Sequence, residues 1–315
     1  MHLDYSVIVI TYHPSFEKLK KTLYSIIIQE DINFEIIVAD DGSEQNFFSE
    51  INEWFKQNKF EQYKLVENKK NQGTVKNIIS ALQVASGRIV KCISPGDFLY
   101  DKKTLFKYKK HMENEQLYVC FGKTAYFSIN GKECQFYSKH NPTDLSVYRK
   151  RNQKKILRNY IAYADFPVGA SFVVDRTVFQ KYISIISDKV TYCEDTSYLM
   201  MINDGYEMGF LDEYIVWYEY GSGISTQVSS KWKKIIDNEV KSVYEIMSEK
   251  DKLAKKGYKF LYDGVENYFI DMVRKILLSP AYLLLLLKTK YCKEAMNFSV
   301  ENLEQIILYE EKRNE

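Results

Sequence analysis

The chain begins with a regular alternation of short apolar runs and stretches in which apolar residues have helical spacing. Strands alternating with amphipathic helices favour an α/β fold, in which a doubly wound, mostly parallel central sheet carries helices on both faces. The predicted strands are Tyr5–Ile10, Phe34–Ala39, Tyr63–Glu67 and Arg88–Ile93. The helices predicted after the second and third strands are Glu44–Gln57 and Thr74–Ala85.

Polar residues follow the first, second and fourth of these strands: Thr11-Tyr12, Asp40-Asp41-Gly42-Ser43 and Ser94-Pro95-Gly96-Asp97. The carboxyl ends of parallel strands lie at one edge of a sheet, where open α/β folds bind ligands. Carboxylates at this edge can accept hydrogen bonds from the base or ribose of a nucleotide. Aspartate, glycine and serine are also common turn residues, so a simple turn remains an alternative for the second segment.

The pattern changes in the second half of the chain. Apolar runs at Leu117–Phe127 and Cys134–Tyr137, separated by Asn130-Gly131, predict a hairpin-type insertion. A further strand is expected at Ser171–Val174, and from Ser229 onward the apolar residues have helical spacing. The sequence therefore predicts an α/β domain followed by a C-terminal helical region.

A leucine-rich segment lies within this helical region. Met272–Leu287 contains five consecutive leucines from Leu283, has basic residues at both ends and is interrupted by Ser279-Pro280. It is shorter than the ~20 apolar residues that span a bilayer. Two interpretations remain open: a buried helix that packs on the main domain, or an interfacial helix that contacts anionic lipid, which would make the protein membrane-associated.

Composition excludes several classes of protein. With 44 Lys+Arg against 42 Asp+Glu, the net charge of +2 gives no general reason to expect a nucleic-acid partner. The five cysteines are scattered without a CxxC pair, which indicates reduced thiols. The amino terminus lacks the basic and small-residue features of a signal peptide. We therefore expect a cytoplasmic protein, at most at the inner face of the plasma membrane.

The order of several short motifs resembles the family 2 glycosyltransferases of bacterial polysaccharide, O-antigen and capsule synthesis. These are inverting, nucleotide-sugar-dependent enzymes of the Rossmann-like GT-A fold, and the resemblance covers roughly residues 4 to 220. None of the motifs is specific alone, but their order and spacing are. They are Ser6-Val7-Ile8-Val9-Ile10-Thr11-Tyr12, Val38-Ala39-Asp40-Asp41-Gly42-Ser43, Asn71-Gln72-Gly73-Thr74-Val75-Lys76-Asn77, Ala85-Ser86-Gly87-Arg88, Ser94-Pro95-Gly96-Asp97 and Glu194-Asp195.

The resemblance assigns one group of residues to nucleotide binding. Lys76, where the family often has arginine, would bring positive charge to the uracil or the diphosphate. Gly73 would let its loop pass close to the nucleotide. Structural alternatives are a packing role for Tyr12, a solvated helix position for Lys76 and a helix-start hydrogen bond for Asn77. The whole group is Thr11, Tyr12, Asp40, Asp41, Gly73, Lys76, Asn77 and Asp97.

The chain departs from the family at its metal motif. Where the family has Asp-x-Asp, this sequence has Ser94-Pro95-Gly96-Asp97, so only Asp97 remains as a ligand for a divalent ion, Mn²⁺ or Mg²⁺. Such an ion can be bound by one carboxylate together with substrate phosphates and water. The alternatives are a turn in which Asp97 caps the next helix and a relative with impaired catalysis.

The resemblance makes Asp195 the general base and Glu194 its supporting residue. In an inverting transfer, a carboxylate takes the proton of the acceptor hydroxyl as that hydroxyl attacks the anomeric carbon. The alternative is structural, because acidic residues at the start of a helix complement the helix dipole.

The expected enzyme is therefore a hexosyltransferase-type glycosyltransferase that moves a sugar, UDP-linked by preference, to a glycan or lipid-linked acceptor. We expect a GT-A domain over residues 1–225, with a nucleotide-binding half (1–97) and an acceptor half (98–225), and a helical region over 226–315. Alternative functions are a catalytically impaired nucleotide-sugar-binding or scaffold protein and a nucleotidyltransferase. The latter would need a glycine-rich basic loop after the first strand, which Thr11-Tyr12-His13-Pro14 does not provide.

Overall fold

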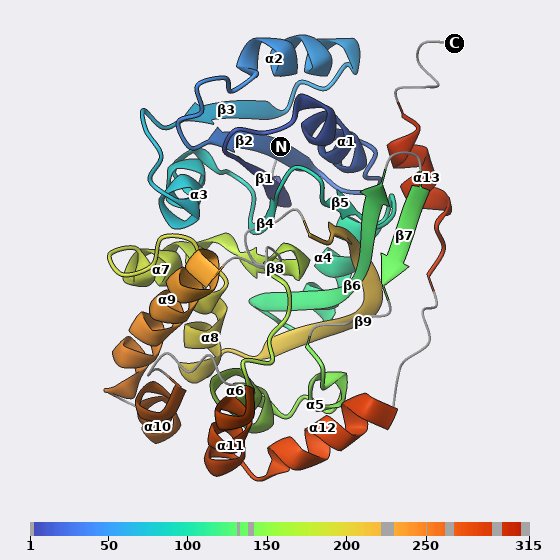
Figure 1. Ribbon diagram of the computed structural model, residues 1–315. Helices are drawn as coiled ribbons and strands as arrows, with labels where there is room; N and C mark the ends of the chain where they lie inside the picture. The colour runs from blue at the N-terminus through green and yellow to red at the C-terminus, as the bar shows by residue number, and fades with distance from the viewer. Residues whose placement is uncertain are drawn as a thin grey trace.

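A central sheet runs through the molecule in the computed structural model (Figure 1), which describes residues 3–130, 133–137, 142–221, 230–249, 251–261, 268–291 and 298–309. Within these residues the sheet has nine strands in the order β3-β2-β1-β4-β8-β6-β9-β5, with β7 paired to β6. The strands are β1 (Tyr5–Thr11), β2 (Phe34–Asp40), β3 (Tyr63–Glu67), β4 (Ile89–Ile93), β5 (Phe98–Leu99), β6 (Val119–Asn130), β7 (Glu133–Tyr137), β8 (Phe172–Asp175) and β9 (Met208–Glu219).

The first four strands form the parallel, doubly wound half that the sequence predicts. Because side chains alternate along a strand, Ile8 of β1 faces one core while Val7 and Val9 face the other. The second core is completed by helices α1 (Phe16–Ile27), α2 (Phe48–Gln57) and α4 (Thr104–Asn114). The first core is completed by α3 (Thr74–Val84) and α7 (Arg176–Ile186). Helices thus cover both faces of the sheet (Figure 1).

The second half of the sheet is mixed. β8 lies antiparallel to β4 and to β6, whereas β6 lies parallel to β9. The predicted hairpin is confirmed, because β6 and β7 pair antiparallel with Asn130 opposite Glu133. The turn residue Gly131 lies outside the described residues. The helical elements of this half are α5 (Leu145–Arg149), α6 (Gln153–Tyr163), the 3₁₀ turn η1 (Gly169–Ser171) and α8 (Thr196–Asn203).

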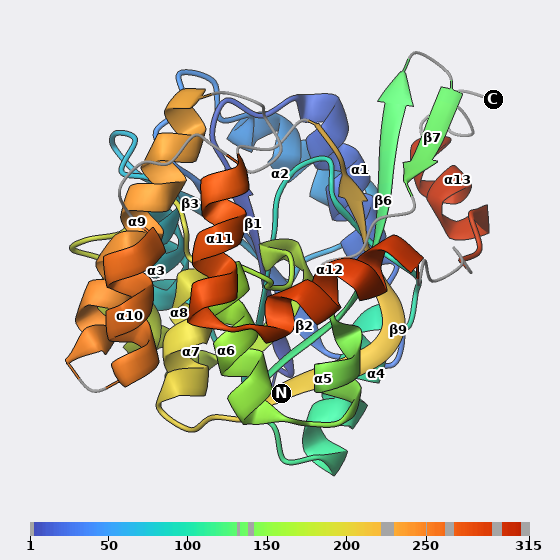
Figure 2. The ribbon, with the colours of Figure 1, turned by 60° about the horizontal axis from the view of Figure 1, so that its bottom comes forward.

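The C-terminal helices pack on this domain at two separate places (Figure 2). Val243 and Tyr244 of α9 lie in the same core as Ile161 of α6. At the opposite side, Leu303 of α13 packs against Trp217 of β9. The expected boundary between residues 225 and 226 lies outside the described residues. These helices are α9 (Ser230–Ser248), α10 (Lys252–Leu261), α11 (Tyr268–Leu278), α12 (Ala281–Tyr291) and α13 (Glu301–Ile307).

The leucine-rich segment forms two helices, α11 and α12, which are separated at Ser279-Pro280. One side of α12 is buried, because Tyr282 and Leu285 pack against Tyr163 at the end of α6. Its other side leaves Leu284 exposed by 69%. The buried interpretation therefore holds for one side of α12, whereas contact of the exposed side with lipid stays a prediction. Among the residues that the structure describes, no helix is long and apolar enough to cross a membrane.

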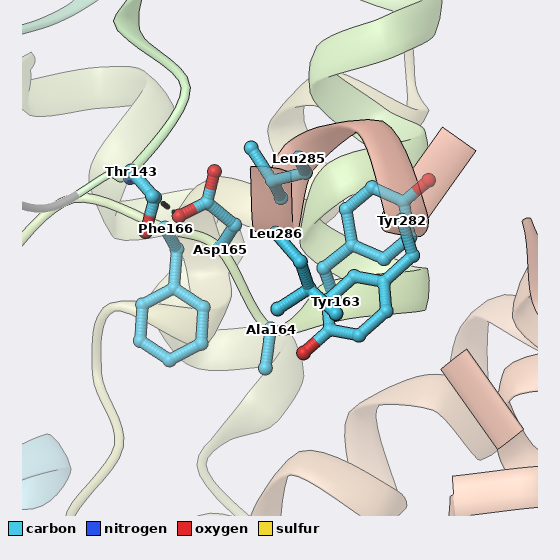
Figure 3. A pocket seen from close by; sticks show the side chains of 8 residues that line it. All are labelled: Thr143, Tyr163, Ala164, Asp165, Phe166, Tyr282, Leu285 and Leu286. Carbon is cyan, nitrogen blue, oxygen red and sulfur yellow. Dashed lines mark hydrogen bonds between the residues drawn. The ribbon is translucent and has the colours of Figure 1, made fainter. Parts of the chain in front are cut away.

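A cavity of about 320 Å³ lies where α12 meets the end of α6 (Figure 3). The only carboxylate that lines it belongs to Asp165, which is 7% exposed and accepts hydrogen bonds from the backbone N–H groups of Thr143 (2.5 Å) and Asp144 (3.1 Å). Burial raises the pKa of this carboxyl group. Its lining residues are Thr143, Tyr163, Ala164, Asp165, Phe166, Tyr282, Leu285 and Leu286.

Candidate active site

Three parallel strands end together at one edge of the sheet, as the sequence predicts. β1 pairs in parallel with both β2 and β4, and Thr11 is level with Asp40. The residues that follow the three strands are Tyr12, Asp41 and Ser94. The segments named from the sequence therefore meet at a single edge, although they are far apart along the chain.

Asp40 and Thr11 are enclosed within this edge, with 0% and 1% exposure. The Asp40 carboxylate accepts hydrogen bonds from Thr11 Oγ1 (2.9 Å), the Ser43 backbone N–H (2.7 Å) and Ser43 Oγ (2.7 Å). These bonds close the turn in which Gly42 adopts a φ of +76°. In this arrangement both side chains bond within the protein and shape the edge on which a ligand would lie. The nucleotide contact expected of them stays a prediction.

A second set of hydrogen bonds draws the loop after β3 onto the same edge. Asp41, 3% exposed, accepts from two backbone N–H groups of this loop (the shortest bond is 2.7 Å) and from Asn68 Nδ2 (3.1 Å). Asn77 donates to the Ala39 carbonyl (2.9 Å) and accepts from Asn68 (3.1 Å). Asn77 thus ties α3 to β2 and directs its amide into the protein. The sequence analysis missed Asn68, although it directly follows the predicted strand Tyr63–Glu67.

Gly73 allows a close approach, and the group that approaches is Thr191. Gly73 has a φ of +88°, and a Cβ atom added there would lie 2.2 Å from Thr191 Cγ2 and 2.7 Å from the Thr191 carbonyl oxygen. The same carbonyl accepts a hydrogen bond from the Val75 N–H (2.9 Å). Gly73 thus makes a contact between the two halves of the domain, and the role expected of it toward a nucleotide stays a prediction. We call the sheet edge formed by the ends of β1, β2 and β4 the strand-end edge. The Thr191 contact places this edge beside the loop that leads to Glu194 and Asp195.

Replacing Gly73 by alanine is expected to destabilise the protein by about 2 to 4 kcal/mol, because the backbone strain of a positive φ adds to a clash with backbone atoms. Gly205→Ala is the matched control: Gly205 has a similar φ of +94°, but an added Cβ would meet nothing within 4 Å. Chemical denaturation measures both variants. Equal losses in the two would contradict a role for the Thr191 contact.

Tyr12 and Lys76 differ from the other residues of this edge because they face solvent. Tyr12 is 50% exposed, and its ring lies 4.3 Å from that of His13. Lys76 is exposed on the first turn of α3 and forms no ion pair with any described residue. An exposed aromatic ring and a solvated cation at one sheet edge suit a base and a phosphate, respectively.

Asp97 follows β4 and is 8% exposed. Its Oδ1 atom accepts a hydrogen bond from the Glu219 backbone N–H (3.0 Å), so the end of β9 lies against it. Burial raises the pKa of Asp97 to about 7, and the nearby Glu219 carboxylate acts in the same direction. The structure thus brings to this edge a residue, Glu219, that the sequence analysis did not identify.

Glu194 and Asp195 lie side by side just before α8. Asp195 is at the N-cap position but makes no side-chain capping hydrogen bond, and the backbone N–H groups of Asp195 and Thr196 favour the ionised form of its carboxyl group. Burial raises the pKa of both carboxyl groups, and the charge of Asp195 raises that of Glu194 further. Asp195 is therefore the more readily ionised of the two near neutral pH, as a general base requires.

The loop before this pair is held by Glu239 of the C-terminal helix α9. The Glu239 carboxylate, in a side chain that is 7% exposed, accepts hydrogen bonds from the backbone N–H groups of Thr191, Tyr192 and Cys193 at 2.9–3.3 Å. Tyr192 also packs edge-on against Trp232 of α9. A carboxylate that binds successive N–H groups fixes the path of the backbone. No pattern in the sequence indicates this contact, since Glu239 belongs to an ordinary amphipathic helix.

The η1 turn lies against the acidic pair Glu194 and Asp195. A Cβ atom on Gly169 would lie 3.1 Å from Glu194 Oε1. Two buried side chains hold the η1 turn in place: Lys91 donates a hydrogen bond to the Ala170 carbonyl and Tyr108 donates one to the Ser171 carbonyl. Burial lowers the pKa of Lys91 to about 8. Lys91 lies within a predicted apolar strand, and the sequence analysis did not single it out.

The fold is similar to that of several solved glycosyltransferase structures. One is S. aureus TarS 1-349, with a TM-score of 0.54 and 14% identity over 99% of this chain and 91% of that chain. TarS 1-349 in complex with UDP-GlcNAc gives 0.53 and 15% over 99% and 92%. The mannosyltransferase PcManGT from Pyrobaculum calidifontis, in complex with GDP-Man and Mn²⁺, gives 0.58 and 14% over 94% and 77%. At this identity the likeness shows the GT-A fold. No curated protein matches the chain.

The family is shown by the sequence itself. Residues 6–183, more than half of the chain, match the model of glycosyl transferase family 2. The matched region contains the strand-end edge and the η1 turn. The chain therefore belongs to glycosyl transferase family 2 and is a glycosyltransferase.

Proposed function

We propose that this enzyme transfers a sugar, with inversion, from a nucleotide sugar to a hydroxyl group of a glycan or lipid-linked acceptor in cell-surface polysaccharide synthesis. The observation that carries the proposal is the contact of Gly73 and Val75 with Thr191. It joins the strand-end edge to the loop that leads to Asp195, so a donor and a base can act on the same reacting centre.

The proposed reaction is a single displacement. The acceptor oxygen forms a bond to the anomeric carbon, the bond from that carbon to the β-phosphate oxygen breaks, and the nucleoside diphosphate leaves. Asp195 accepts the proton of the attacking hydroxyl. Glu194, whose pKa is raised further, holds a proton near neutral pH and limits the negative charge next to the base.

The pH dependence of transfer follows from the burial of Asp195. Because burial raises the pKa of Asp195 above the ordinary 3.8, its carboxylate becomes protonated at a higher pH than a solvated aspartate does. The rate constant kcat should therefore rise with pH along an acid limb whose midpoint lies above 3.8. A profile of kcat at saturating donor measures this limb. A rate that is constant down to pH 4 would contradict the assignment.

A UDP-sugar is the proposed donor. Tyr12 offers an exposed ring for the base, and Lys76 offers a cation for the uracil side or the diphosphate. TarS, whose fold is similar, has been solved with UDP and with UDP-GlcNAc. Asp41 would act on the donor by holding the loop after β3 at this edge, because its carboxylate accepts backbone N–H bonds from that loop.

A divalent cation, Mn²⁺ or Mg²⁺, fits the donor atoms near Asp97. One of its oxygens, Oδ1, accepts a backbone hydrogen bond, while Oδ2 accepts none from any residue that the structure describes. A bound cation would neutralise charge on the departing diphosphate. Among the described residues no group of three or more acidic, histidine or cysteine side chains could hold a metal ion. Phosphates and water would therefore have to supply most of the ligands.

The test of the proposed function is a panel of nucleotide sugars with and without Mn²⁺. A donor that binds only the folded protein raises its melting temperature, and release of the nucleoside diphosphate reports turnover. We expect stabilisation by UDP and turnover with at least one UDP-sugar. Stabilisation without turnover across donors and acceptors would favour a catalytically impaired binding or scaffold protein.

We propose that the exposed side of α11 and α12 contacts an anionic membrane that carries the acceptor. Phe269, Leu277 and Leu284 are exposed by 64%, 68% and 69%. Basic residues flank them in the sequence, at Lys288 and Lys290 among other positions. Replacing Leu277 and Leu284 by serine should reduce co-sedimentation with anionic vesicles by several-fold and leave nucleotide binding unchanged. Unaltered co-sedimentation would contradict this contact.

A further inference from the structure

A second carboxylate lies against the segment that stands where the family has its metal motif. Gly96, directly before Asp97 in this segment, has a φ of +105°. A Cβ atom added to it would lie 2.5 Å from Glu219 Oε2 and 3.6 Å from Lys18 Cδ. The Glu219 carboxylate therefore lies where the first atoms of an aspartate side chain at residue 96 would be.

The topology of the sheet delivers Glu219 to this place. β5 follows Asp97 directly and pairs antiparallel with β9, with Phe98 opposite Trp217. Glu219 is the last residue of β9, and its backbone N–H binds Asp97 Oδ1 at 3.0 Å. The two carboxylates belong to strands that are far apart in the sequence, yet one hydrogen bond joins the residues that carry them.

Both carboxylates are largely shielded from water. Asp97 is 8% exposed, and the side chain of Glu219 is 11% exposed. Two such groups close together are unfavourable unless a cation compensates their charge. Two lysines act on this pair: the ammonium group of Lys18, whose Nζ lies 2.6 Å from Glu219 Oε2, and the buried Lys91, whose charge lowers the pKa of Asp97.

Lys18 is suited to a reversible contact. It extends from the first turn of α1, which begins after the N-cap residue Ser15, and its side chain is 42% exposed. A half-exposed lysine loses little free energy on leaving a carboxylate for water. Its departure would leave two carboxylates at the strand end, and hard oxygen atoms are the ligands that Mn²⁺ and Mg²⁺ prefer.

We propose that Glu219 is the second carboxylate ligand, beside Asp97, of a divalent-cation site, and that Lys18 is the resident counter-ion that the metal and the donor diphosphate displace. The inference rests on the proposed function, because the diphosphate completes the coordination. Glu219 thus takes the part that the aspartate of the family motif has lost. Lys18 keeps the site electrically balanced in the absence of metal.

Binding of Mn²⁺ to the full chain tests this inference without any measurement of turnover. Electron paramagnetic resonance measures free Mn²⁺ in the presence of protein, with and without UDP. Glu219→Gln should weaken Mn²⁺ binding in the presence of UDP by about tenfold, through the loss of a charged ligand. Lys18→Met should strengthen the binding of Mn²⁺ alone by about fivefold, through the loss of a competing cation.

Lys20→Met is the matched control, because Lys20 lies on the same helix and pairs with Glu17 at 3.3 Å. It should leave Mn²⁺ binding unchanged. Melting temperatures close to wild type in all three variants show that the fold is retained, as expected for side chains at the rim of the domain.

Two results would overturn the inference. One is wild-type Mn²⁺ affinity in Glu219→Gln. The other is a Lys18→Met variant that loses UDP binding and gains no Mn²⁺ affinity, because Lys18 would then be a permanent substitute for the metal. In both cases the wild-type protein would still bind UDP, so the proposed function would stand. If UDP fails to bind the wild type under any condition, the proposed function itself fails. The comparison of Lys18→Met with Lys20→Met in Mn²⁺ alone still tests whether Lys18 competes with the cation.

Discussion

Asparagine in place of Asp195 is expected to lower the rate of sugar transfer by about 10²- to 10⁴-fold, the usual contribution of a general base. The amide has nearly the shape of the carboxylate but accepts no proton at neutral pH. Because Asp195 is assigned to the acceptor hydroxyl, UDP binding should change by less than about twofold. Single-turnover transfer assays measure the rate, and thermal stabilisation by UDP measures binding.

Asp204→Asn is the control for this prediction. Asp204 lies at the other end of α8, where its carboxylate accepts a hydrogen bond from Tyr182 (2.7 Å). This variant removes a charge from the same helix without altering the acidic pair. Transfer by Asp195→Asn at a rate close to that of Asp204→Asn would remove Asp195 from the mechanism.

Glutamine in place of Glu239 is expected to reduce kcat by about 10- to 100-fold, although Glu239 has no assigned contact with substrate. Its carboxylate binds three successive backbone N–H groups, and a side-chain amide would turn an N–H donor toward some of them. The loop would shift, and Asp195 would move with it. Displacement of a reacting group by about 1 Å can cost about 10²-fold in rate.

The pattern of kinetic constants separates positioning from general loss of structure. The KM for the donor should stay within about twofold, because no hydrogen bond joins Glu239 directly to a described strand-end residue, whereas kcat falls. Glu245→Gln is the control on the same helix, since Glu245 forms an exposed ion pair with Lys189 (3.2 Å). If the two variants have the same kcat, Glu239 does not position the base.

The sequence predicted the strands, helices and turns that are determined by patterns among neighbouring residues. The apolar runs near Tyr5–Ile10 and Phe34–Ala39 became adjacent parallel strands, and the order of strands and helices placed their polar ends together. The hairpin around Asn130 was also predicted, because turn residues between apolar runs form a strong local signal. The family itself was confirmed over residues 6–183.

Contacts between distant segments could not be predicted in the same way. The Asp40 carboxylate accepts hydrogen bonds from Thr11 and Ser43, and no local pattern predicts this. A strand-end aspartate has the same sequence context whether it faces a ligand or a turn. Glu239 and Glu219 are also indistinguishable from surface residues until the fold brings each to a strand end or loop. Long-range packing, which single-residue patterns do not encode, decides these roles.

The leucine-rich segment shows the same limit within one helix. Leu284 and Leu285 are neighbours of identical chemistry, yet Leu284 is 69% exposed and Leu285 9%. The partner that decides between them is Tyr163, which lies more than a hundred positions earlier. A run of identical residues carries no helical period, so the buried side of α12 could not be identified from the sequence.

Helix α13 packs against β9 of the sheet, and this contact affects folding during synthesis. Leu303 and Ile306 cover Trp217, and Tyr309 stacks on Tyr24 and binds Asn58 at 2.7 Å. Until α13 has been synthesised, the side chains of Trp217 and Tyr24 lack this cover, and chaperones or another nascent chain can bind them. Completion of the native contacts of this region therefore waits for α13 to emerge, even though Trp217, which it covers, is translated much earlier.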